Sequence, residues 1–457
     1  MRENWEKYGN PDGIRSFSLG IALPAWLVDN QNSWYVLGAY GLVFGIALPI
    51  FVGKWWSKSK KYTKDKILHL SMGLYYREMK DNMTIRKLVE VLSASMEFKE
   101  EVEWRESDNA TVPEFFQKMK KEIESITGDT FERSKKFTAP YCFKAYLALY
   151  AHMFRIAVDD KQLEADFRFI IDKSVHLLLG MLKISIARDW LNTSLNCMTL
   201  CQMLVQGVWE NQSCLLQLPH FNNEIIKHCK SKKKPIKSFK DLLDLNEDDR
   251  KALLKTLDES QIKDILNVAK SFPIVSIDSV SLKVLGQNNV TTDGLVTCQV
   301  KLSVTRAGAP VISISPAEAE ENTLEIDEDG NIEQVSAAKK ALMGIENPNE
   351  PIHAPRISPE KRPYWWVLVA STKSNTLLAP PVKVADLVDF KTVVLLFKAP
   401  SKPGEVTLTV HVKCDSIFGT DISKDVKMNV MQDTAEDEQA VDEELSDEEK
   451  DAGGFDD

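Results

Sequence analysis

The sequence predicts a single-pass membrane protein in which an all-α helical bundle is followed by an antiparallel β-sandwich. Three observations lead to this fold class. An uncharged apolar segment lies near the N-terminus, apolar residues then recur with a helical period to about residue 270, and after Phe272 they alternate with polar residues. The chain has 457 residues, which is enough for two or three domains after a membrane segment.

The apolar segment from Gln31 to Gly53 carries no charge and is bounded by Asp29 and Lys54. A helix rises about 1.5 Å per residue, so about twenty residues cross a hydrocarbon core of about 30 Å. Aromatic rings, which favour the headgroup level, stand at both ends: Trp34, Tyr35, Trp55 and Trp56. We therefore expect a transmembrane helix over residues 31–53. The alternative, a buried helix of a soluble protein, does not explain these flanking residues.

Lysines follow the apolar segment and indicate its orientation. Because basic residues gather on the cytosolic side, they predict a cytosolic body and a lumenal N-terminal arm, residues 1–30. The lysines are Lys54, Lys58, Lys60, Lys61, Lys64 and Lys66. In the arm, Gly20–Val28 is apolar but too short to span, so it should lie at the membrane surface or against a partner. Five N-x-S/T sequons should then stay unglycosylated: Asn82, Asn109, Asn192, Asn211 and Asn289.

Residues 54–214 are expected to form the helical bundle, and residues 215–272 a subdomain of short helices. Thr84 is a candidate helix cap, and Pro113 suits the first turn of a helix that ends near Gly128. Two pairs resemble capping boxes, in which two polar groups satisfy each other's backbone partners: Ser238 with Asp241, and Asp258 with Gln261.

The segment from Trp190 to Trp209 is also uncharged and long enough to suggest a second span. Its polar residues recur at three- and four-residue spacing and form one stripe: Asn192, Asn196, Thr199, Gln202 and Gln206. Five polar groups facing lipid would be costly. We therefore expect a buried helix of a soluble bundle.

Residues 273–432 are expected to form the β-sandwich, because short segments with alternating apolar residues are separated by turn residues. The candidate strands are 274–285, 296–304, 365–370, 392–397, 406–414 and 425–431. An acidic, proline-containing insertion, residues 313–362, interrupts them. We expect this insertion to be an exposed loop.

The C-terminal segment, residues 433–457, holds thirteen carboxylates against Lys450 alone, so it is expected to be disordered. A flexible polyanion attracts basic partner segments, although a tail that only confers solubility is the alternative. The candidate partner-binding residues are Asp433, Glu436, Asp437, Glu438, Asp442, Glu443, Glu444, Asp447, Glu448 and Glu449. Ser446 and Thr434 precede acidic residues and are candidate phosphorylation sites.

No catalytic motif stands out, so we expect neither an enzyme nor a cofactor. The sequence lacks a phosphate-binding G-x-x-x-x-G-K-[ST] loop, a G-x-S-x-G elbow and an H-E-x-x-H zinc motif. The seven cysteines form no C-x-x-C pair and the seven histidines are scattered, so no metal site is expected and the thiols should be reduced and buried. Lysines between Lys227 and Lys240 form a basic patch that could meet RNA, a ribosome, anionic lipid or an acidic segment, or be a solvated loop.

Several segments resemble the Sec-sixty-three family. Residues 4–13 (NWEKYGNPDG) and 20–26 (GIALPAW) are similar to the end of its J domain and the start of its last membrane helix. Residues 216–221 (LQLPHF) resemble a signature of its helical region. Residues 399–404 (APSKPG), with Asp415, Ser416 and Gly419, resemble the last strands of its fibronectin-III-like domain. The resemblance covers essentially the whole chain.

This resemblance implies a non-enzymatic subunit of the protein-translocation machinery in the endoplasmic reticulum membrane, with the β-sandwich of fibronectin-III or immunoglobulin type. It implies docking on the Sec-sixty-one channel, binding of the basic segment of Sec-sixty-two by the acidic tail, and contact with membrane lipid but not with nucleic acid. It also implies that part of the arm faces the channel, namely Gly20, Ile21, Leu23, Pro24 and Trp26.

One departure concerns the J domain, whose His-Pro-Asp tripeptide is absent from the sequence. The chain looks as though it begins at the end of that domain, as a truncated product or a partial sequence, so a lumenal Hsp70 is expected as a partner only if the domain is present. The helical and β regions also resemble modules of spliceosomal RNA helicases, which makes a nucleic-acid remodelling module one alternative. A membrane adaptor unrelated to translocation is another.

Overall fold

A computed structural model of the protein describes residues 5–6, 33–231, 235–284, 290–305, 349–358, 360–387 and 389–432. The chain divides into two compact units, Met1–His69 and Leu70–Asp457, and each is described by itself.

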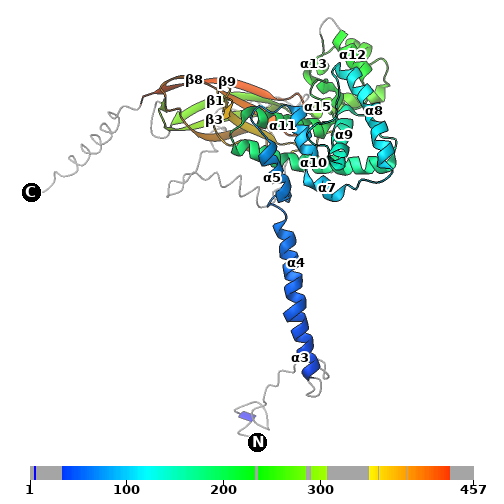
Figure 1. Ribbon diagram of the computed structural model, residues 1–457. Helices are drawn as coiled ribbons and strands as arrows, with labels where there is room; N and C mark the ends of the chain where they lie inside the picture. The colour runs from blue at the N-terminus through cyan, green and yellow to red at the C-terminus, as the bar shows by residue number, and fades with distance from the viewer. Residues whose placement is uncertain are drawn as a thin grey trace, which may run out of the picture. The chain divides into compact units, whose positions relative to one another are not determined.

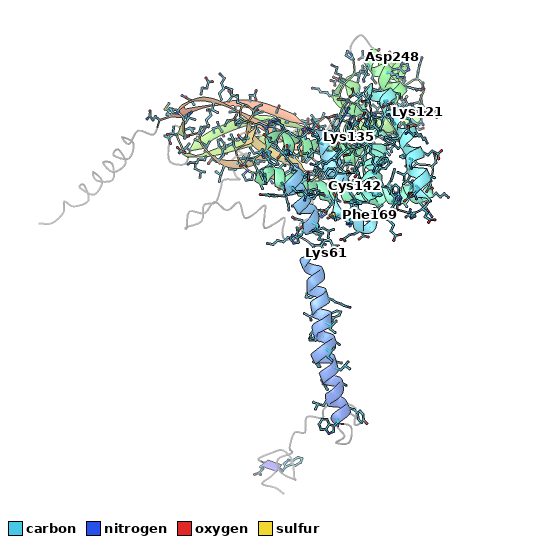
Figure 2. All side chains as sticks on the ribbon, viewed as in Figure 1. Lys61, Lys121, Lys135, Cys142, Phe169 and Asp248 are labelled. Carbon is cyan, nitrogen blue, oxygen red and sulfur yellow. The ribbon has the colours of Figure 1, made fainter. Side chains whose placement is uncertain are left out.

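The first unit contains one long apolar helix. It consists of α3 (Ser33–Leu42), the π-helical turn η1 (Val43–Ala47) and α4 (Leu48–Lys60). Pro49 has no N–H to donate to the carbonyl of Gly45, which coincides with the wider turn at that point. From Leu37 to Trp55 the mean hydropathy is 1.6 and none of the window is buried, so its side chains project freely (Figure 2). In the described part of the chain, this is the helix long and apolar enough to cross a membrane.

The second unit begins with a helical region (Figure 1). Its helices are α5 (His69–Glu78), α6 (Ile85–Ser93), α7 (Met96–Glu101), α8 (Asp108–Thr127), α9 (Pro140–Phe154), α10 (Lys161–Ala187), α11 (Leu191–Gln206), η2 (Cys214–Gln217), α12 (Asn223–Ser231), α13 (Phe239–Leu243), α14 (Glu247–Leu253) and α15 (Glu259–Ser271). The expected switch from helices to strands near Phe272 is confirmed, because β1 begins at Ile274.

Local signals in the sequence account for several helix boundaries. Both expected capping boxes form, at the starts of α13 and α15. Gly128 ends α8 with a positive φ of 75°, as the sequence predicts. Two details differ: Thr84 occupies the N-cap of α6 without a side-chain capping bond, and Pro113 lies inside α8 because that helix begins earlier, at Asp108.

Two sheets follow the helices. One has the strand order β1-β3-β7, with β1 (Ile274–Val284), β3 (Leu295–Thr305) and β7 (Phe390–Lys398). The other has the order β2-β9-β8-β4-β5, with β6 also on β4; its strands are β2 (Val290–Thr291), β4 (Trp365–Ser371), β5 (Thr376–Leu377), β6 (Val382–Val384), β8 (Gly404–Cys414) and β9 (Ile422–Met431). The expected antiparallel pairing holds for the described pairs with one exception, since β2 pairs with β9 in parallel.

The inward residues of both sheets contribute to one hydrophobic core, together with residues of α12–α15. Val296, Cys298, Val300 and Leu302 of β3 are buried in alternation, as expected, and so are Leu408, Val410, Val412 and Cys414 of β8. The six longer strands therefore lie where the alternation places them.

Part of the predicted insertion is packed against the rest of the unit. Asn349 is buried and its side-chain amide donates to the carbonyls of Pro363 and Ala385. Lys361 forms an ion pair with the fully buried Asp415, at 2.5 Å. The described residues of 349–362 lie outside helices and strands and are mostly exposed or half-buried, as expected of a loop, but the loop is anchored to the rest of the unit at Asn349 and Lys361. Residues 313–348 lie outside the described residues.

Candidate binding sites

The polar stripe of α11 faces the sheet. The side-chain amide of Gln202 donates to the carbonyl of Cys414 (2.6 Å) and to Asp421 (2.7 Å), and that of Gln206 donates to the carbonyl of Ser416 (2.8 Å). Both glutamines are buried, so these bonds replace the water that the amides and carbonyls lose. The buried soluble helix expected over residues 190–209 is confirmed, and Thr199, Gln202 and Gln206 hold the helical region against the end of β8, whereas Asn196 donates to the carbonyl of Met83 within the helical region.

A third glutamine completes this contact. Gln217, at the end of η2, donates to the carbonyl of Phe418 (2.7 Å) and accepts from the N–H of the same residue (2.9 Å). We call Gln202, Gln206 and Gln217 the glutamine cluster, because all three bind the main chain of residues 414–418. Gln217, in the family-like segment 216–221, therefore meets the main chain beside the family-like residues Asp415, Ser416 and Gly419.

Charged groups surround the glutamine cluster. Lys413 pairs with Asp421 (2.6 Å) and donates to Thr199 of α11 (2.9 Å). Burial by itself would lower the pKa of Lys361, but the neighbouring Asp415 carboxylate outweighs it and leaves that pKa raised. Lys361 is therefore held as a cation beside its buried partner.

The cysteines near this contact are not reactive groups. All seven cysteines of the chain are free and buried. Burial raises the pKa of the Cys201 thiol to about 12 and that of the Cys214 thiol to about 11, so both stay protonated at neutral pH. Within the described ranges, no group of three or more His, Cys, Asp or Glu residues could hold a metal ion.

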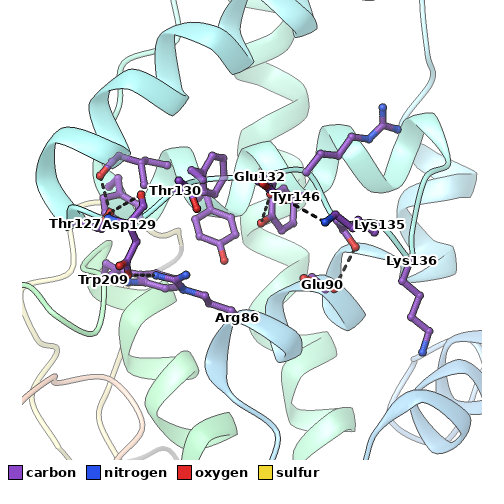
Figure 3. A pocket seen from close by; sticks show the side chains of 16 residues that line it. Arg86, Glu90, Thr127, Asp129, Thr130, Glu132, Lys135, Lys136, Tyr146 and Trp209 are labelled. Carbon is purple, nitrogen blue, oxygen red and sulfur yellow. Dashed lines mark hydrogen bonds and ion pairs between the residues drawn. The ribbon is translucent and has the colours of Figure 1, made fainter.

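A cavity of about 440 Å³ opens between α6, α9 and the loop that follows α8 (Figure 3). Aromatic rings form an interlocking set along it, with centroid distances between 4.7 and 6.3 Å: Phe131, Tyr146, Tyr150, Phe154 and Trp209. The indole N–H of Trp209 is buried and has no hydrogen-bond partner in the described part of the chain. The cavity has the size of a small-ligand or side-chain pocket.

The polar groups around this cavity are largely paired with one another. Arg86 pairs with Asp129 (2.8 Å), and Ser134 donates to Glu90 (3.1 Å), as the dashed lines show (Figure 3). Burial raises the pKa of Tyr146 to about 12, so this phenol is not a base at neutral pH. The lining thus combines an apolar aromatic wall with charged groups that largely pair with one another.

The site residues predicted from the sequence lie outside the described residues. This applies to the acidic tail, Asp433–Glu449, with Thr434 and Ser446, and to the arm residues Gly20–Trp26. Of the basic patch, Lys227, Lys230, Lys237 and Lys240 are described and exposed. The glutamine cluster and the aromatic cavity, in contrast, were not predicted as sites, because their members come from segments far apart in the sequence.

Comparison with known proteins shows the family. The family model described as "Sec63 Brl domain" matches residues 63–427, which is most of the chain. The chain belongs to the Sec-sixty-three (SEC63) family. SEC63 relatives include the translocation protein SEC63 homolog of Homo sapiens, 29% identical over 94% of this chain and 74% of that protein. Another is the translocation protein sec63 of Schizosaccharomyces pombe, 27% identical over 98% of this chain and 67% of that protein.

The SEC63 region also resembles part of larger proteins. A DExH-box ATP-dependent RNA helicase of Arabidopsis thaliana is 32% identical over 64% of this chain, but only 12% of the helicase is covered. The resemblance to helicase modules that the sequence suggests is thus confirmed. It concerns a SEC63-type region that occurs in both kinds of protein.

Proposed function

We propose that this SEC63 family protein is a non-enzymatic, single-pass subunit of the protein-translocation machinery in the endoplasmic reticulum membrane. One observation carries the proposal: an exposed apolar helix, Leu37–Trp55, directly precedes a SEC63-type region that begins at residue 63. Water would solvate such a helix poorly, whereas a bilayer would solvate it well. The proposed process, protein translocation, follows from the names of the relatives, which are called translocation proteins.

We assign the parts as follows. Residues 31–53 span the membrane and residues 1–30 form the lumenal arm, with Gly20–Trp26 against the channel. Residues 54–214 form the helical bundle, and residues 215–272 the short-helix subdomain. Residues 273–432, with the insertion 313–362, form a fibronectin-III-like sandwich that docks on the Sec-sixty-one channel and helps to open it. Two sheets that share one core suit this sandwich architecture.

Membrane insertion and orientation are tested together on microsomes. An integral helix keeps the protein in the pellet after alkaline carbonate washing, and the proposed topology leaves the sequon at Asn109 without sugar. A new sequon placed in the 1–30 arm should in contrast receive sugar and serves as the positive control. Release by carbonate, or sugar on Asn109, would overturn the proposal.

The acidic tail, residues 433–457, is proposed to bind the basic segment of Sec-sixty-two through its carboxylates. Affinity purification from detergent should recover both the channel and this partner, and deletion of residues 433–457 should lose only the basic partner. Phosphate at Ser446 or Thr434 adds negative charge and should tighten binding. Equal affinity of phosphorylated and unphosphorylated tail for a basic peptide would reject the role of phosphorylation.

The similarity to a helicase favours a second candidate, a nucleic-acid remodelling module. It predicts salt-sensitive RNA binding that weakens when Lys230–Lys234 are neutralised. The third candidate, a membrane adaptor unrelated to translocation, predicts co-purification without any channel subunit.

A further inference from the structure

Helix α5 buries one side and leaves the other open. On the buried side, Ser71 donates to Glu97, and the phenol of Tyr75 bonds the hydroxyl of Ser95 (2.6 Å). On the open side, Leu70 is 63% exposed and Tyr76 is 62% exposed. These are large apolar side chains, and both lie on the same short helix. Such a face costs free energy in water unless something covers it.

Two arginines, Arg77 and Arg188, lie on the open side of α5. The guanidinium carbon of Arg188, at the end of α10, lies 4.2 Å from the ring centre of Tyr76 and 5.2 Å from that of Trp190. In the described part of the chain Arg188 has no ion-pair partner, and Arg77, whose side chain is 73% exposed, pairs with Glu78 at 2.9 Å. We call Leu70, Tyr76, Arg77, Arg188 and Trp190 the α5 surface. It combines interfacial aromatic rings with positive charge.

The chain leads directly from the apolar helix to this surface. A tight turn follows α4, in which the N–H of Thr63 donates to the carbonyl of Ile67 (2.8 Å) and the N–H of His69 donates to that of Lys61 (3.1 Å). The turn thus brings His69 back beside Lys61, the residue that follows α4, and Leu70 is the next residue, about 3.8 Å further along the chain.

This connection keeps the start of α5 within a short stretch of chain from the apolar helix. Lys61 is six residues beyond Trp55, the end of the apolar window, which corresponds to about 9 Å along a helix. The interfacial layer on each side of a bilayer is about 5–7 Å thick. Arginine and tyrosine side chains extend far enough to close the difference, as they do when they snorkel.

We propose that the α5 surface rests on the headgroups of anionic lipids next to the membrane span and forms a second membrane contact of the cytosolic body. Tyrosine and tryptophan favour the interface, and each lysine or arginine near an anionic surface is attracted to it. Residues 61–80 supply five lysines or arginines against two carboxylates, a balance that suits this surface. The contact rests on the proposed single span and goes beyond it, because it adds a lipid-binding surface outside the span.

The test uses the full chain, reconstituted into vesicles of phosphatidylcholine with or without phosphatidylserine. Because the seven native cysteines are buried, a dye reacts selectively with one cysteine introduced on the surface. Leu70→Cys reports on the α5 surface, and Leu42→Cys reports on the span. Asp248→Cys is the matched control: it is exposed on α14, which packs against α12 at the end of the helical region away from α5 (Figure 1).

When phosphatidylserine is present, lipids that carry a quencher should lower the fluorescence of a dye at position 70 several-fold. The fluorescence of a dye at position 248 should not change. Arg188→Gln with Arg77→Gln should reduce the quenching at position 70, whereas the surface substitution Lys121→Gln should not. Quenching at position 42 without quenching at position 70 would overturn the contact and leave the span intact. The lipid contact would also be overturned if lipid never quenched the dye at position 70 and only an added partner protein changed its fluorescence. Absence of quenching at position 42 would instead reject the span.

Discussion

Gly419 offers a sharp test of the contact between the helical region and the sheets. Its φ is +83°, and a Cβ placed on it would lie 2.8 Å from the Cβ of Cys214 and 3.3 Å from its Sγ. Gly419→Ala therefore meets two penalties. A left-handed conformation costs an L-residue about 1–2 kcal/mol, and overpacking costs about 1–3 kcal/mol. A stiffer unfolded chain returns about 0.4–1 kcal/mol, which leaves a net loss of roughly 2–4 kcal/mol.

Gly128→Ala separates the two penalties. Gly128 has a similar φ of +75°, but a Cβ there meets nothing within 4 Å. Gly128→Ala should therefore lower the free energy of unfolding by only about 0.5–1 kcal/mol, which is the conformational part of the effect. Combining Gly419→Ala with Cys214→Gly, which removes the clashing atoms, should recover about 1–3 kcal/mol as a favourable coupling in a double-mutant cycle.

The measurement is urea-induced unfolding of the full chain in detergent, followed by tryptophan fluorescence. Trp209 is buried and reports on the helical region. If Gly419→Ala and Gly128→Ala cost the same, the close approach of residue 419 to Cys214 does not exist and the proposed packing of the two regions is wrong. If the double mutant shows no coupling, the penalty of Gly419→Ala does not arise at Cys214.

Three further predictions concern buried polar groups. Lys144→Met should cost about 3–5 kcal/mol in urea unfolding, because it removes a fully buried ammonium that lies 2.8 Å from Asp108 and 2.5 Å from Asp166; a loss below about 1 kcal/mol would argue against the buried pairs. Burial, opposed by the carbonyl of Leu204, lowers the pKa of His152 to about 4, so stability should fall as pH drops from about 6.5 to 4, by up to about 3 kcal/mol. His152→Gln should flatten this part of the pH profile, and an unchanged slope would assign it to another group. Gln202→Leu should cost about 1–3 kcal/mol, because it leaves the buried carbonyl of Cys414 without a donor; wild-type stability of this variant would mean that the amide is not needed there.

Local patterns predicted much of the secondary structure. The capping boxes at Ser238 and Asp258 depend on residues three positions apart, so the sequence contains all the information needed to place them. The long strands are also local signals: β3 and β7 show buried residues at every second position, and β4 is a short, almost continuously buried apolar segment. The strands β2, β5 and β6 span two or three residues, which is too short for a period to appear.

Features that depend on distant residues were not predicted. The parallel pairing of Val290 with Val430 is one example, since register and strand order follow from the whole fold. The anchoring of the loop 349–362 is another: its composition suggests a loop, and the ion pair that holds Lys361 involves Asp415, which lies more than fifty residues later. The aromatic cavity was not predicted either, because its lining brings together residues as distant in the sequence as Phe131 and Trp209.

The glutamine cluster has an evolutionary consequence. Its three amides recognise the peptide groups of residues 414–418 and ignore the identity of the side chains there. A substitution in that segment therefore leaves these hydrogen bonds in place as long as the backbone path is kept, although Cys414, Asp415 and Ser416 are themselves buried and are constrained by their own contacts. The glutamines themselves have no such freedom, since asparagine is one methylene too short and glutamate would bring a carboxylate to a carbonyl. Related chains should therefore keep glutamine at these three positions.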